Sequence, residues 1–222
     1  MFKLLKTFLL FTLFSIITSS NANAQFGGLL KQVTGGDLGA LTGQQTEIVQ
    51  TLVNGLTEYT NGQSQVAKAL GLKKQVDILD SEQDALSSGN VKDKKSIQRS
   101  MKVSTNAQKA IDKKMAESSE ISAEAKVEFR KALPYYARGT ASSIALIPQV
   151  ISWGSNATNA VTSGGMMGGL KIARSLGTGI FLVKNLPGYV TSAKKSYGTM
   201  MAFSRKNEID TSEAESLLGD DL

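Results

Sequence analysis

The sequence lacks the two side chains that enzymes most often use as nucleophile or base at neutral pH. Its 222 residues include no His and no Cys. A thiolate nucleophile, an imidazole base, a disulfide and the usual ligand sets for zinc, haem and iron–sulfur clusters are therefore excluded. Chemistry would have to rest on carboxylates, Ser or Lys. We accordingly predict a non-enzymatic protein with no metal and no cofactor.

One run of carboxylates has the alternation of a calcium loop without its other requirements. Asp80, Glu82 and Asp84 alternate, but Ala85 occupies the sixth position and Val91 the twelfth. Calcium loops of this type need Gly for a sharp turn at the sixth position and a bidentate Glu at the twelfth. We interpret the cluster as a solvated helix face or helix end.

Two further patterns contain residue types suited to chemistry in an unsuitable context. Ser192-x-x-Lys195 has the spacing used by some Ser–Lys hydrolases, but Ser and Lys are frequent enough here to produce it by chance. The Gly-rich stretch 164–169 lacks the Lys and Ser/Thr of a phosphate-binding loop, and no strand is predicted before it. A hydrolase that uses carboxylates or Ser and Lys therefore remains only a second alternative.

Small residues recur at every fourth position late in the chain, at Gly165, Gly169, Ala173 and Gly177. On a single helix these four positions form one smooth side. Such a stripe lets two helix backbones approach closely, both in membranes and in water-soluble bundles. We predict a helix-packing stripe here, within a water-soluble bundle.

Charge is unevenly distributed over a chain whose formal net charge is +6. Residues 141–207 carry seven basic side chains and no Asp or Glu, whereas 208–222 carry six carboxylates. A carboxylate-free block of this length faces anionic material or is neutralised by an acidic segment of the same chain. We predict that an anionic surface is contacted by four of its cations, Lys171, Arg174, Lys194 and Lys195.

The first residues have the three-part pattern of a bacterial secretory signal peptide. Lys3 and Lys6 precede an apolar stretch from Thr7 to Thr18, and residues 22–24 read Ala-Asn-Ala. Signal peptidase recognises this small-x-small ending, and the apolar stretch is short for a membrane span of roughly 20 residues. We predict cleavage after Ala24 and location in the periplasm or outside the cell. Because no Cys follows the site, a lipoprotein is not expected.

The rest of the chain has the periodicity of helices rather than strands. Apolar residues recur at helical spacing, while alternating runs with hairpin turns are absent. We predict an all-α fold, an irregular bundle of about five or six helices over 44–207. A flexible Gly-rich arm (25–43) would precede it, and an acidic tail with a short helix (208–222) would follow. Asn61-Gly62, the two prolines at 134 and 148, and Pro187 are expected to end or kink helices.

The uncharged segment 139–170 is long enough to suggest a membrane span but too rich in Ser, Thr, Asn and Gln for one.

The favoured function is an exported interaction module that binds an envelope protein or an anionic lipid surface through its basic C-terminal half. The first alternative is a membrane-active protein that inserts an amphipathic hairpin from about 141 to 186. No nucleic-acid partner is expected for an exported protein. The sequence is compatible with a homo-oligomer. No motif points to a particular family.

Overall fold

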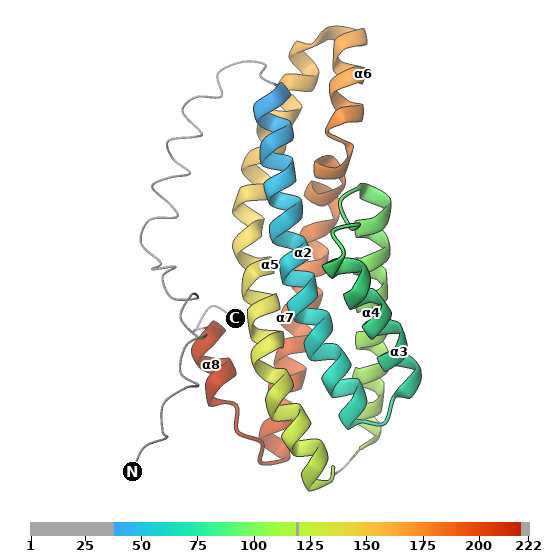
Figure 1. Ribbon diagram of the computed structural model, residues 1–222. Helices are drawn as coiled ribbons and strands as arrows, with labels where there is room; N and C mark the ends of the chain where they lie inside the picture. The colour runs from blue at the N-terminus through green and yellow to red at the C-terminus, as the bar shows by residue number, and fades with distance from the viewer. Residues whose placement is uncertain (1–37, 119, 219–222) are drawn as a thin grey trace, which may run out of the picture. The chain divides into compact units, whose positions relative to one another are not determined.

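The computed structural model describes residues 38–118 and 120–218, all within one unit of the chain, Gly36–Leu222. The described residues form helices and no strand, which confirms the predicted all-α bundle. Seven helices occur in the described residues. They are α2 (Leu38–Ala69), α3 (Lys73–Ser87), α4 (Lys94–Glu117), α5 (Ala123–Ser163), α6 (Gly165–Ser175), α7 (Gly177–Lys206) and α8 (Ser212–Leu218) (Figure 1). The six helices α2–α7 agree with the predicted five or six, and α8 is the short helix predicted in the acidic tail. The predicted signal peptide lies outside the described residues.

Helix α2 is longer at both ends than its apolar pattern predicts. It begins at Leu38, so the predicted boundary between arm and bundle at Gln44 falls inside the helix. It also continues past Asn61-Gly62, where we expected it to stop. Gly62 is a packing residue, because a Cβ there would lie 2.7 Å from Cδ2 of Tyr136.

The true end of α2 is a left-handed glycine. Gly71 has φ +70°, the conformation that glycine adopts without steric cost. The amide of Leu72 donates to the carbonyl of Ala67 (2.8 Å), and the amide of Gly71 donates to Lys68 (3.0 Å). These two bonds form a Schellman motif, which satisfies carbonyls left open at the helix end.

Helix α5 contains both prolines that we expected to end or kink it, and α7 contains Pro187, so none of the three ends a helix. A proline inside a helix costs about 3 kcal/mol, because it removes a hydrogen bond and crowds the preceding turn. Buried packing offsets this cost: Leu133 is 1% exposed and Tyr136 is fully buried. Ser122 is the N-cap of α5, since its hydroxyl accepts from the amide of Ala125 at 3.2 Å.

The apolar residues form two clusters along the bundle. One is centred on aromatic residues of α2, α5 and α7, including Phe129 and Tyr197. The other surrounds Trp153, whose indole N–H donates to the carbonyl of Leu41 at 2.9 Å. Ile144 of α5 packs against both clusters.

Helices α2 and α5 lie side by side (Figure 1) and meet through small residues. A Cβ at Gly139 would lie 2.8 Å from the Tyr59 amide nitrogen and 2.9 Å from the Gly55 carbonyl oxygen. Substituents larger than hydrogen therefore cannot enter this contact without separating the helices. A close helix pairing therefore lies here, at positions that the four-residue stripe did not predict.

The chain turns between α6 and α7 at Leu176, eleven residues before Pro187, where the sequence suggested a boundary. Leu176 is fully buried, so the turn is anchored in the second apolar cluster. None of the described helices combines the length and apolar composition needed to cross a membrane.

Candidate functional site

The junction of α5 and α6 is a tight glycine turn at one end of the bundle (Figure 1). Gly165 has φ +62°, which reverses the chain immediately after Gly164. A Cβ at Gly169 would lie 2.4 Å from the carbonyl oxygen of Val161, so α6 packs directly on the backbone of α5. We call residues 164–174 the α5–α6 tip.

The α5–α6 tip exposes large apolar side chains that a water-soluble surface would normally cover. Met166 is 85% exposed, Met167 82% and Leu170 54%. Lys171 and Arg174 follow on the same short helix, and both are exposed. Adjacent exposed apolar residues that are bordered by cations are typical of surfaces that bind lipid or protein.

The predicted helix-packing stripe is divided by this geometry. Gly169 makes the close approach, while Gly165 lies in the turn and Gly177 begins α7 on the far side of the Leu176 turn. An added Cβ would meet no atom within 4 Å at Gly165 or at Gly177. Ala173 is half-buried. The four positions therefore do not lie on one helix.

The four cations predicted to contact an anionic surface also fall into two groups. Lys171 and Arg174 lie on α6, whereas Lys194 and Lys195 lie on α7. Lys195 is 18 residues beyond the start of α7 at Gly177, which corresponds to about 27 Å of helix. One flat contact at the α5–α6 tip would engage the first pair and leave the second far from it.

The acidic tail neutralises part of the basic chain, as its charge suggested. Asp210 pairs with Arg130 (3.3 Å) and Glu215 with Arg205 (2.8 Å). These pairs hold α8 against α5 and α7, while the apolar side of α8 buries Ala214 in the first cluster. Lys171 and Arg174 of the α5–α6 tip form no ion pair with a carboxylate of the described residues.

A buried polar network links α2, α4 and α5 in the middle of the bundle. The Gln108 Oε1 atom accepts from Gln63 Nε2 (3.0 Å) and from the Tyr136 hydroxyl (3.0 Å). The Gln108 Nε2 atom donates to Asp112 at 2.8 Å. The Oε1 atom of Gln63 has no hydrogen-bond partner within the described part of the chain. Buried networks of this kind fix the register of packed helices.

Burial dominates the acid–base properties of this network. Desolvation raises the pKa of the Tyr59 and Tyr136 hydroxyls well above the ordinary value, and it raises that of Tyr189 to about 12. Desolvation also raises the pKa of the half-buried Asp112 carboxyl, although its hydrogen bond from Gln108 opposes the shift. The tyrosines therefore stay protonated and do not act as bases. The hydroxyls of Tyr59 and Tyr136 donate to Gln108 Oε1.

A groove runs between α4 and α7 beside this network. One part has a volume of about 400 Å³, and an adjoining hollow of about 170 Å³ shares Thr105, Lys109, Tyr189 and Ser192 with it. We call the two together the α4–α7 groove. The sequence gave no sign that α7 lies opposite the lysines of α4. Only the seven-residue spacing of Lys102 and Lys109 could have pointed to a shared side.

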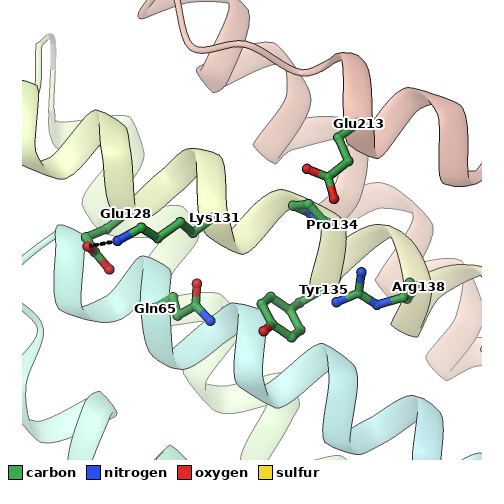
Figure 2. Close-up of a pocket in the computed structure, with 7 residues that line it drawn as sticks. All are labelled: Gln65, Glu128, Lys131, Pro134, Tyr135, Arg138 and Glu213. Carbon is green, nitrogen blue, oxygen red and sulfur yellow. Dashed lines mark hydrogen bonds and ion pairs between the residues drawn. The ribbon is translucent and has the colours of Figure 1, made fainter. Parts of the chain in front are cut away.

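A third hollow, of about 600 Å³, lies between α2, α5 and α8. Figure 2 shows Tyr135 at its centre with the guanidinium of Arg138 beside the ring, 4.6 Å from the ring centroid. Arg138 also pairs with Glu58 (2.8 Å), and Lys131 pairs with Glu128 (3.0 Å). Because the basic groups already have carboxylate partners, little charge is left for a ligand.

The residues considered for catalysis or calcium are used in packing. The run of carboxylates lies within helix α3, not in a loop, and Glu82 is buried rather than solvated as we had interpreted. Glu82 accepts from the Ser100 hydroxyl (2.5 Å) and pairs with Arg99 (3.5 Å). The Ser192 hydroxyl donates to the carbonyl of Gly188. Within the described residues no group of three carboxylates is placed to hold a metal ion.

Comparison of the chain with known proteins gives no relative from which a function could be inferred. No family model matches the chain, and neither the curated proteins nor the solved structures contain a significant match to it.

Proposed function

We propose that this protein is an exported, non-enzymatic envelope protein that binds an anionic membrane surface through the α5–α6 tip. The observation that carries the proposal is the exposure of Met166 (85%) and Met167 (82%) beside Lys171 and Arg174. No Asp or Glu occurs between Glu128 and Glu208, so no nearby carboxylate opposes an anionic surface.

The chemistry of the tip suits reversible binding at the boundary between head groups and acyl chains. Full burial of a Met or Leu side chain contributes about 1.5–3 kcal/mol. Each cation near an anionic leaflet adds about 1 kcal/mol. Methionine is unbranched and adapts to an irregular environment, which lipid chains provide. An amphipathic segment of this kind would lie in the interface rather than cross the membrane.

A vesicle-binding experiment tests the proposal. We expect the protein to co-sediment with phosphatidylglycerol vesicles at low salt and not with phosphatidylcholine vesicles. Replacing both Met166 and Met167 with Ser should weaken binding by about tenfold or more, since two apolar side chains then stay in water. Lys171→Gln with Arg174→Gln should also weaken it and should reduce its dependence on salt.

Matched controls separate the tip from general properties of the chain. Ile151 is 56% exposed on α5, and Ile151→Ser should leave vesicle binding unchanged. Lys113→Gln removes a surface cation of α4 and should likewise have no effect. Equal losses from control and tip variants would contradict the proposal. Leakage of vesicle contents would favour the membrane-active alternative, in which the hairpin from about 141 to 186 inserts.

A further inference from the structure

The α4 wall of the α4–α7 groove carries two cations. Lys102 and Lys109 line it and are exposed, and neither forms an ion pair with another described residue. The two positions are seven residues apart, close to two helical turns, so they share a side of α4 with about 10 Å between them. Their ammonium groups are free to bind anions from outside.

The opposite wall, on α7, is uncharged along the 400 Å³ part of the groove. Phe181, Asn185 and Tyr189 lie along it, at four-residue spacing. A Cβ at Gly188 would meet no atom within 4 Å, so the wall is open at this point. This wall therefore offers an amide and aromatic surface rather than competing charge.

The adjoining hollow adds a third cation, Lys195, and the groove's single carboxylate among the described lining residues, Asp112. Asp112 already accepts from Gln108 Nε2 at 2.8 Å, and desolvation raises its pKa. Hydroxyls of Ser104, Thr105 and Ser192 line the space between the charged groups. The lining is thus positive, with many hydrogen-bonding groups.

We propose that the α4–α7 groove binds a small ligand with two phosphate or carboxylate groups held about 10 Å apart by a hydroxyl-bearing spacer. Lys102 and Lys109 bind the two anionic groups, because charge-assisted hydrogen bonds to oxyanions are the strongest contacts that such side chains make. The hydroxyl and amide groups of the walls bind the spacer.

Calorimetric titration with fructose 1,6-bisphosphate tests this proposal on the purified protein. We expect saturable binding of one molecule per chain, about tenfold or more tighter than binding of inorganic phosphate, which can engage only one lysine at a time. Vesicles of cardiolipin, which carries two phosphates per head group, form a second arm. Saturation by the soluble bisphosphate indicates a free ligand, and saturation by the vesicles alone indicates a lipid head group where Gly188→Leu abolishes it.

Gly188→Leu is the decisive variant, because Gly188 lines the groove and an added Cβ there would meet no atom within 4 Å. We expect this variant to fold, with unchanged circular dichroism and melting temperature, because leucine is a better helix former than glycine. Its binding should fall by about tenfold or more. Gly198→Leu is the matched control: this glycine of α7 also has open space around it and does not line the groove.

The lysines are tested in the same way. Lys102→Gln and Lys109→Gln should each weaken binding by about tenfold, whereas Lys113→Gln, one turn further along α4, should not. Absence of binding in both arms overturns the proposal, as does binding that Gly188→Leu leaves intact. Equal losses for all three lysine variants would show general attraction to a cationic surface and would also overturn it. Because the α5–α6 tip lies outside the groove, this outcome is independent of the proposed membrane contact.

Discussion

At the scale of single residues, the molecule depends on glycines that face a neighbouring helix. Gly179 is the most crowded, since a Cβ there would lie 2.2 Å from the Trp153 ring. Gly169 meets the backbone of α5, which cannot move aside as a flexible side chain can. Other glycines of the same helices, Gly177 among them, face open space.

Two glycines of the predicted stripe, Gly169 and Gly177, should therefore respond differently to the same substitution. Gly169→Ala should lower the free energy of unfolding by about 1–3 kcal/mol, because its Cβ cannot fit against the Val161 carbonyl. Gly177→Ala should change it by less than about 0.5 kcal/mol, as at ordinary surface positions. Equilibrium unfolding in urea measures both. Equal destabilisation would show that the stripe packs along its whole length.

Sequence periodicity identified Gly169 but not the glycines of the α2–α5 contact. A spacing of four within one segment is visible in the sequence, whereas Gly55 and Gly139 are 84 positions apart and meet only in the folded bundle. Gly62 was misinterpreted because Asn-Gly is also a turn signal, and the Tyr136 ring that explains it belongs to another helix. Local signals cannot reveal which side chain lies opposite.

At the scale of helices, the existence of each helix was predicted from the sequence more accurately than the residues at which it ends. The apolar repeat depends on burial over many residues, so it survives in the structure of α2, α4, α5 and α7. Helix ends depend on a few residues whose local preference packing can override. Pro187 is the clearest example, since the chain turns instead at the fully buried Leu176.

Helix α8 is the element whose attachment depends most directly on ionised carboxylates. Hydrogen bonds from Ser212 hold the pKa of the Asp210 carboxyl below its usual range, with Arg130 contributing. Hydrogen bonds from Arg205 and Thr211 do the same for Glu215. A depressed folded pKa contributes stability above the unfolded value, which is about 3.9 for Asp and 4.3 for Glu. That stability is lost as the pH falls through the folded pKa.

Acid should therefore weaken the docking of α8. We expect the melting temperature of the wild type to fall more steeply between about pH 5 and pH 3 than that of Asp210→Asn combined with Glu215→Gln. The variant lacks the groups whose protonation removes the contacts. Glu47→Gln, at an exposed carboxylate of α2, should follow the wild-type curve. Parallel curves for the wild type and the double variant would contradict the expectation.

At the scale of the whole molecule, the predicted signal peptide decides which partners the protein can meet. We expect mass spectrometry of the protein from the periplasm or the medium to give a chain that begins at Gln25. Cleavage is expected because Ala22-Asn23-Ala24 follows a basic and then an apolar segment. A chain that retains Met1 and stays in the cytoplasm would remove the envelope membrane as a partner.

The candidate surfaces were predictable only in part from the sequence. The absence of carboxylates between Glu128 and Glu208 pointed to the basic C-terminal half. It did not show that Lys171 and Lys195 lie at different places along the bundle, because the turn at Leu176 has no clear sequence signal. The α4–α7 groove was not predicted, because its two walls come from segments about 80 residues apart in the sequence.

The two apolar clusters have a consequence for how the chain folds. Each of the five longest helices, α2, α3, α4, α5 and α7, supplies residues to both clusters, and Ile144 contacts both. Any cut in the sequence between these helices therefore leaves two incomplete cores, so neither fragment retains a domain that folds alone. The described bundle should behave as one cooperative folding unit, in which amides beside Trp153 and beside Phe129 exchange with solvent through the same global opening.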